Sequence, residues 1–183
     1  MTILTRRGAV LGTLALGVAA CDNSVGSSGG ATIDARVAQT LNYMYRTYPE
    51  TRELSDKSAG MLVMPLVGEA GFMIGGSYGE GALVIEEVTV DYYSATQASI
   101  GFQLGAQQFA YVMFFMTPEA LRRFRTSPGW AAGAAAEYVG GESGDSLKAS
   151  TATKNSVIAF LFAQQGLMAG ATVEGTKYTR ILR

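Results

Sequence analysis

A glycine pattern that recurs along the chain limits what this sequence can fold into. The run GFMIGG at 71–76 reads glycine, large apolar, any, apolar, glycine, small. The same form returns at 101–106, 129–134 and 166–171, with starts 30, 28 and 37 residues apart. Because alternate residues of a strand share a face, each copy has one face of bulky side chains and one of nearly bare backbone. Such segments suit strands of a curled sheet that a neighbour approaches closely. The structural glycines are then Gly71, Gly75, Gly101, Gly105, Gly129, Gly133, Gly166 and Gly170.

The glycine-rich run at 71–84 also has to be compared with phosphate-binding loops. A Walker loop needs Gly-Lys-Ser/Thr, and the nearest upstream lysine is Lys57. A dinucleotide fingerprint needs a third glycine and a helix, whereas Gly79-Glu80-Gly81 continues into a strand-like Ala-Leu-Val. A membrane-helix contact would need a long apolar helix around G-x-x-x-G, and no copy has one. These glycines therefore belong to the scaffold, and the sequence predicts no cofactor.

The residue types needed for much enzyme chemistry are missing. The chain has no histidine and one cysteine, which removes Ser-His and Cys-His catalysis, histidine or cysteine metal sites and internal disulfides. A carboxylate-driven hydrolase is the remaining enzyme hypothesis, with Glu86, Glu87 and Asp91 as the densest acidic group. On a strand Glu86 and Glu87 would point to opposite faces, which suits solvated charges better than a catalytic pair. We therefore predict a protein that is not an enzyme, with no catalytic residues and no metal site.

The N-terminus reads as an export signal. Arg6 and Arg7 precede an apolar stretch of thirteen residues at 8–20, too short to span a bilayer. The following VAAC at 18–21 resembles the lipobox of bacterial lipoproteins, which implies an acylated Cys21 as the new N-terminus. An ordinary secretory signal with an incidental cysteine is the alternative. The paired arginines also leave the twin-arginine route open beside the general secretory one.

This interpretation divides the chain into three parts. Residues 1–20 are the signal peptide, 21–31 are the acylated cysteine with a flexible Gly/Ser tether, and 32–183 are one domain. Losing Arg6 and Arg7 takes the net charge from −1 to −3, which excludes a broadly basic nucleic-acid binder. We expect an exported protein of the bacterial cell envelope that faces the periplasm. Asp22 resembles an inner-membrane retention signal and slightly favours that membrane over the outer one.

The helical spacing of apolar residues predicts an amphipathic helix at the start of the domain. Thr32 is its expected N-cap, and Pro49 ends it at about Tyr48 before a short helix through Leu54. Such a helix beside a lipid tether could lie on a membrane, although it more often covers the core of its own domain. Its membrane-facing candidates are Arg36 and Arg46.

The remaining elements define the expected fold. We predict strands at 61–64, stopped by Pro65, and at 82–90, 109–116 and 157–162, with a turn at 79–81 and a polar loop at 140–145. Thr117 and Pro118 begin a helix whose Leu121 and Phe124 face inward. The fold class is α+β. It is a single compact domain of mostly antiparallel strands that form a curled sheet, a barrel or a sandwich, with the N-terminal helix and one central helix packed on it.

Charge is distributed unevenly along the domain. Residues 58–119 contain six acids and no base, whereas 120–183 contain eight bases and four acids. The two segments could attract each other, the bases could form a face for anionic lipid, or the charges could be scattered and solvated. Near the end of the central helix, Arg122, Arg123 and Arg125 are candidates for binding lipid headgroups. Their charge also suits the helix dipole without any ligand.

Several of these segments together resemble the SYLF domain family. The resemblance rests on AGMLVMP, AGFMIGGSYGEGALV, ASIGFQLGAQQFAYVMFFMT and GLMAGATVEG, and it covers about 58–175. It implies a compact α+β domain that binds phosphoinositides in eukaryotic members and is linked there to actin and membrane traffic. Bacterial members are typically exported proteins or lipoproteins described as lipid-binding. This chain lacks a strongly basic stretch beside the domain, so headgroup specificity does not carry over.

Two functions follow from these observations. The first is a lipid-anchored envelope protein whose domain binds phospholipid, anionic by preference. The second is an envelope scaffold or protein-interaction module, with an unidentified envelope protein as partner, whose membrane attachment comes from Cys21 alone.

Overall fold

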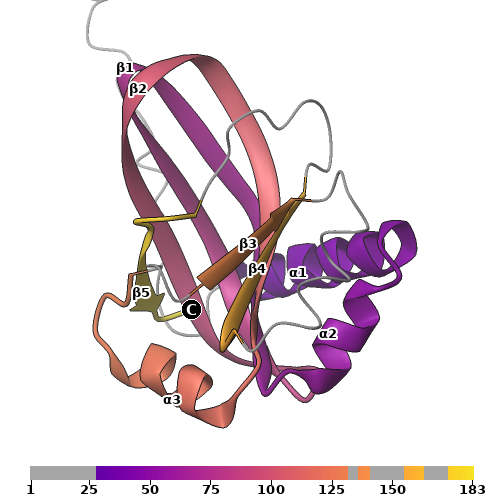
Figure 1. Ribbon diagram of the computed structural model, residues 1–183. Helices are drawn as coiled ribbons and strands as arrows, with labels where there is room; N and C mark the ends of the chain where they lie inside the picture. Colours follow the sequence, from indigo (N-terminus) through magenta and orange to yellow (C-terminus); the bar gives the residue numbers. More distant parts are fainter. Residues whose placement is uncertain (1–27, 132–135, 141–154, 163–172) are drawn as a thin grey trace, which may run out of the picture.

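The computed structural model describes residues 28–131, 136–140, 155–162 and 173–183. Figure 1 shows a sheet of long curved strands with helices packed around it. The described elements, in chain order, are α1 (Ser28–Thr47), α2 (Thr51–Lys57), β1 (Gly60–Ile85), β2 (Val88–Phe115), α3 (Pro118–Thr126), β3 (Ala136–Gly140), β4 (Val157–Phe162) and β5 (Lys177–Ile181). The expected α+β domain with an N-terminal and a central helix on one sheet is confirmed.

The sheet is mostly antiparallel. Its order is β1-β2-β4-β3, and β5 pairs with the first part of β2. Every pairing is antiparallel except that of β3 with β4, which is parallel. The pairings of the described strands do not close the sheet into a barrel. Of the expected forms, which were a curled sheet, a barrel or a sandwich, the curled sheet is the one observed.

The β1–β2 hairpin differs most from the sequence prediction. Glu86 and Glu87 form a two-residue turn with φ of 48° and 65°, so the predicted strand at 82–90 is wrong. The predicted turn at Gly79-Glu80-Gly81 is also wrong, because these residues lie within β1. Pro65 does not end a strand. The register shifts between Met64 and Val67, and a proline at such an irregularity forfeits no regular ladder hydrogen bond.

The first two copies of the glycine pattern face each other in this hairpin. Gly71 is opposite Gly105, and Met73 is opposite Gly101. The copies at 71–76 and 101–106 are therefore neighbouring antiparallel strand segments. Gly129 lies in the connection after α3 with φ of 61°, a conformation that favours glycine. The predicted structural glycines Gly133, Gly166 and Gly170 lie outside the described residues.

Core residues pack on both faces of the sheet. One cluster joins Leu62 and Met64 to Phe124 of α3. The other joins Met61 and Val63 to α1 and α2. Alternate residues point to opposite faces, so a strand buried on both sides reads as a continuous apolar run, as at 109–115. The central strand of the sheet is therefore anchored from two sides.

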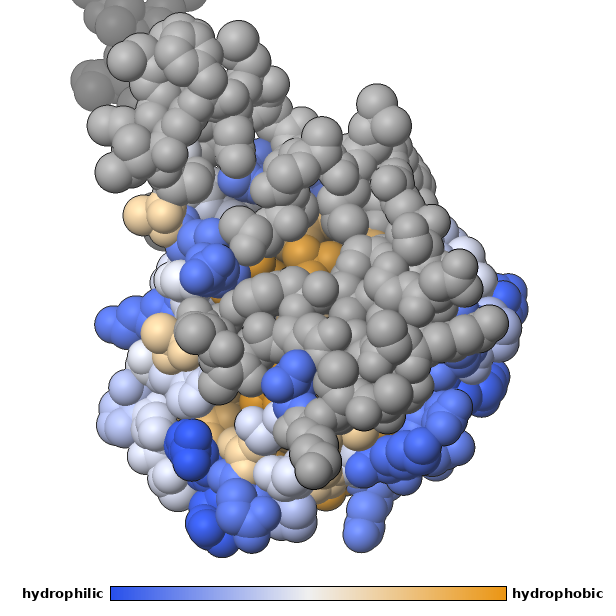
Figure 2. Space-filling model, viewed as in Figure 1, coloured by the Kyte–Doolittle hydropathy of each residue, from blue (hydrophilic) through white to orange (hydrophobic). Residues whose placement is uncertain are grey.

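Helix α1 covers one of these faces. Its buried residues include Ile33, Val37 and Met44, so its apolar stripe faces the protein core. Figure 2 shows hydrophilic residues over the side of the molecule where Figure 1 places α1 and α2.

Helix α1 begins at Ser28 and not after an N-cap at Thr32, so the last four residues assigned to the tether are helical. It ends before Pro49 as expected, whereas α2 lies later than predicted.

Candidate functional site

Helix α3 begins with the predicted signals. Thr117 is the N-cap, and its side-chain oxygen accepts a hydrogen bond from the Ala120 backbone N–H at 3.2 Å. Pro118 occupies the first turn, where its missing N–H has no intrahelical partner to lose. Phe124 is buried against Phe115 and Tyr93, with ring centroids 4.8 and 4.7 Å away. This anchor fixes which side chains of α3 face the sheet and which face outward.

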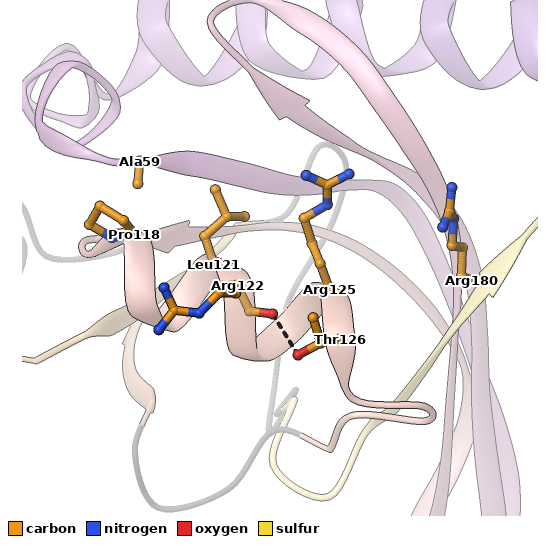
Figure 3. A pocket seen from close by; sticks show the side chains of 7 residues that line it. All are labelled: Ala59, Pro118, Leu121, Arg122, Arg125, Thr126 and Arg180. Carbon is orange, nitrogen blue, oxygen red and sulfur yellow. Dashed lines mark hydrogen bonds between the residues drawn. The ribbon is translucent and has the colours of Figure 1, made fainter.

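A hollow of about 490 Å³ lies between α3 and β5. Figure 3 shows Leu121 and Arg125 rising from α3 toward the sheet, Arg180 of β5 across from Arg125, and Arg122 leaving the helix in another direction. The lining combines cations with apolar and small side chains: Ala59, Pro118, Leu121, Arg122, Arg125, Thr126 and Arg180.

A buried carboxylate holds two of these arginines. The side chain of Asp91 in β2 is 3% exposed. Its Oδ2 accepts a hydrogen bond from Nε of Arg125 at 3.2 Å and forms an ion pair with Nη2 of the same residue at 3.1 Å. Its Oδ1 pairs with Nη2 of Arg180. The side chains of Arg125 and Arg180 are 44% and 61% exposed, so both remain accessible to solvent. Asp91 therefore positions both cations at the edge of the hollow.

The hollow is cationic even with Asp91 included. Three arginines line it and one carboxylate neutralises one of them, so three positive charges less one negative leave a formal charge of +2. Arginine stays protonated and presents a planar fork of donors that suits phosphate and carboxylate oxygens. Leu121 and Pro118 add apolar surface beside the cations. The arrangement suits an anion attached to an apolar group.

Tyr93 lies close to this network. Its hydroxyl is buried and makes no hydrogen bond to any of the residues that the structure describes. Burial raises the pKa of Tyr93, and the charge of Asp91 raises it further, whereas Arg180 and Arg125 act in the opposite direction. A neutral phenol thus lies beside the ion pairs and adds no charge to the site.

The predicted headgroup residues separate into two groups. Arg122 and Arg125 line the hollow, whereas Arg123 is exposed on α3 and does not. Sequence reasoning missed Arg180 and Asp91 as members of this site. The charge imbalance contained a signal, because the acidic segment supplies Asp91 and the basic segment supplies its two partners. Whether these arginines bind a headgroup stays a prediction.

The other singled-out residues lie elsewhere. Arg36 and Arg46 are both exposed on α1. Arg46 donates from Nε to the Asn42 carbonyl at 3.2 Å. Arg36 lines a separate hollow of about 240 Å³ together with Leu66 and Tyr78.

The described part of the chain holds neither a cluster of metal-ligating side chains nor a membrane-spanning helix. There, no three side chains of the His, Cys, Asp or Glu type come together as a metal site would need. None of the helices in the described ranges is both long and apolar enough to cross a membrane.

Comparison with known families identifies part of the chain. Residues 96–180 match the family model described as Ysc84, Las17-binding protein actin regulator. No curated protein matches the chain. The matched segment contains most of β2, all of α3 and nearly all of β5, and thus most of the hollow. The family is associated with lipid and actin binding. Its domain is a binding module, and the family is not a known enzyme family. Residues 96–180 of this chain belong to the Ysc84, or SYLF, domain family.

Proposed function

We propose that this protein is a lipid-anchored protein of the bacterial cell envelope whose domain binds anionic phospholipid. In this proposal residues 1–20 are a signal peptide and Cys21 carries the acyl chains. The domain faces the periplasm, and Asp22 favours the inner membrane. The family membership supports a binding role in general. The lipobox-like VAAC at 18–21 supports the anchor.

The hollow beside α3 is the observation that carries the lipid-binding role. A phospholipid presents a phosphate next to an apolar glycerol and acyl region. Arg122, Arg125 and Arg180 supply donors for the phosphate, and Leu121 supplies apolar contact. With a formal charge of +2 at this site, an anionic headgroup is favoured over a zwitterionic one.

A protein-interaction role is the second candidate. The description of the matched family names Las17 binding and actin regulation, which are contacts with proteins. On this alternative the domain would bind an envelope protein, and the acylated Cys21 would supply all of the membrane affinity.

Vesicle flotation of residues 22–183, which lack the signal and Cys21, separates the two candidates. We expect binding to vesicles that contain anionic phospholipid, weaker binding at higher salt, and little binding to neutral vesicles. Absence of binding to anionic vesicles at low salt would contradict the lipid-binding role and favour the protein-interaction role.

Two neighbouring arginines provide a matched test of the site. Arg122 lines the hollow and Arg123 does not, although both are exposed on the same helix. Arg122→Gln should lower vesicle binding several-fold, by about 1 kcal/mol for one cation at an anionic surface. Arg123→Gln removes the same charge from the chain. Equal losses in the two variants would show that net charge decides binding and not the hollow.

A further inference from the structure

Large hydrophobic side chains that remain exposed gather near one end of α1. In the described part of the chain these residues are Leu66, Tyr78, Val88, Val90 and Leu182, with exposed fractions from 40% to 67%. Each of these residues either lines a hollow together with the first two turns of α1 or is next in sequence to a residue that lies against them. Exposed apolar residues that gather at one place mark an interaction surface more often than scattered ones do.

Glu80 connects Tyr78 to Arg183, which lies beside the first turn of α1. Tyr78 donates a hydrogen bond from its hydroxyl to Glu80 at 2.6 Å. Glu80 also pairs with Arg183, and the Arg183 Cβ lies 3.5 Å from where a Cβ on Gly30 would stand. Leu182, which is 67% exposed, therefore lies next to the start of α1.

Leu66 joins the same region from the other side. It lines the hollow of about 240 Å³ with Ile33 and Arg36 of α1 and with Tyr78. We call Leu66, Tyr78 and Leu182 the apolar collar. Val88 and Val90 lie further along, on either side of Thr89, whose hydroxyl donates to Asp34 of α1 at 2.9 Å.

The position of the collar relative to Cys21 indicates what covers it. Six residues lie between Cys21 and Ser28, the first residue of α1, so seven Cα–Cα steps join the two. A fully extended chain of that length reaches about 25 Å. If Cys21 is acylated, the start of α1 and the collar around it are held close to the bilayer surface. The far end of α1 is about 30 Å away at 1.5 Å per residue.

We propose that the apolar collar docks on the bilayer that holds the lipid anchor, with the start of α1 facing the membrane. Leu66 and Leu182 would enter the region between headgroups and acyl chains. Tyr78 is suited to the same depth, because its ring is apolar and its hydroxyl is already hydrogen-bonded. The exposed guanidinium of Arg36 could meet lipid phosphates there. This inference rests on the proposed function, since the anchor supplies the proximity.

Thiol accessibility in the full chain tests the docking. Acylation of Cys21, the single native cysteine, would leave a chain without free thiols. We would introduce Tyr78→Cys, Leu182→Cys or, as the matched control, Asp56→Cys on the exposed surface of α2. Isolated membranes would be treated with a membrane-impermeant maleimide. The same reaction would be repeated after solubilisation in detergent and after reconstitution into protein-free phospholipid vesicles.

We expect the two collar thiols to react about five-fold more slowly than the α2 control in both membranes and protein-free vesicles, and equally fast in detergent. Equal reactivity of all three thiols in membranes would overturn the inference while leaving the anchor in place. Protection in native membranes that disappears in protein-free vesicles would overturn it as well, because a protein would then cover the collar. Labelling of the unmutated chain at Cys21, with the protein in the soluble fraction, would refute the anchor itself and the docking with it.

Discussion

At the scale of single residues, two glycines of β1 have opposite surroundings. A Cβ on Gly81 would lie 2.0 Å from the Val63 carbonyl oxygen and 2.6 Å from the Met64 sulfur. A Cβ on Gly68 would meet nothing within 4 Å. We expect Gly81→Ala to lower the free energy of unfolding by about 3 kcal/mol or more, because backbone cannot move aside as a side chain can. Gly68→Ala should change it by less than about 1 kcal/mol. Urea unfolding of both variants measures this, and similar losses would contradict the close approach at Gly81.

Asp91 should affect stability and binding in opposite directions. Asp91→Asn removes the buried charge that pairs with Arg125 and Arg180. Since both arginine side chains are about half exposed, water compensates part of the loss, and we expect a destabilisation of about 1–2 kcal/mol in urea. The hollow would gain a positive charge, so flotation with anionic vesicles should increase. Glu53→Gln, which breaks an exposed pair with Lys57, should alter neither quantity appreciably. Weaker vesicle binding by a folded Asp91→Asn variant would contradict the assigned role of the hollow.

Sequence reasoning could reach only part of this residue-level picture. Arg122 and Arg125 were recognisable because they stand together near the end of a clearly signalled helix. Arg180 lies in a short strand remote from α3 in the sequence, and its contact with Asp91 depends on how β5 pairs with β2. Local patterns do not specify that long-range pairing, so the ion-pair network could not be derived from spacing.

At the scale of elements, α3 carries two of the three arginines of the hollow, and its cap gives a sharp test. Thr117→Ala removes the acceptor for the Ala120 N–H and should cost about 1 kcal/mol in urea unfolding. Thr117→Ser keeps an acceptor oxygen at the same place and should stay near the unmutated protein. If both variants lost the same stability, the contribution would come from the threonine methyl group and not from the cap.

The elements that sequence predicted well have strong local signals. Helix α3 has a threonine cap and a proline at its start, and β4 is a short apolar run, so both were found. The hairpin turn was missed because Glu86-Glu87 contains none of the residues that usually supply positive φ. Gly79-Glu80-Gly81 has the composition of a turn. Its second glycine, however, lies within β1 against the Val63 backbone of the same strand, where a side chain would not fit. Close packing thus overrides local turn preference at Gly81.

At the scale of the whole molecule, the uneven charge distribution acquires a structural meaning. The acidic segment meets the basic one through Asp91 with Arg125 and Arg180, and through Glu80 with Arg183. Both pairs lie at the C-terminal end of β5, where Arg180 meets Asp91 and Arg125 of α3, and Arg183, just after the strand, lies beside the start of α1. The C-terminal strand therefore links the arginine-lined hollow to the apolar collar. In the proposed function both surfaces would serve the same membrane-bound role, one through charge and the other through apolar contact.

The tyrosines make alkaline stability a property of the whole fold. Burial is the main cause that raises the pKa of Tyr92, Tyr93 and Tyr111, and it raises the pKa of Tyr78 to about 12. Such groups bind protons more tightly when folded than when unfolded. Their contribution to stability is therefore complete below pH of about 10 and is lost as pH rises through the folded pKa values.

Tyr111 should dominate this alkaline loss. It is 1% exposed and donates its hydroxyl to Tyr178 at 3.0 Å, whereas Tyr78 is 54% exposed and water screens its contribution. We expect the unfolding free energy of the unmutated protein to stay level from about pH 8 to pH 9.5 and to fall as pH rises above about 10. Tyr111→Phe should be less stable at pH 8, having lost a buried hydrogen bond, yet should fall less steeply than the unmutated protein toward pH 11. Tyr78→Phe should flatten the curve by a smaller amount. Urea midpoints from about pH 8 to pH 11 measure both slopes, and an unchanged slope in Tyr111→Phe would show that folding does not raise the pKa of this phenol.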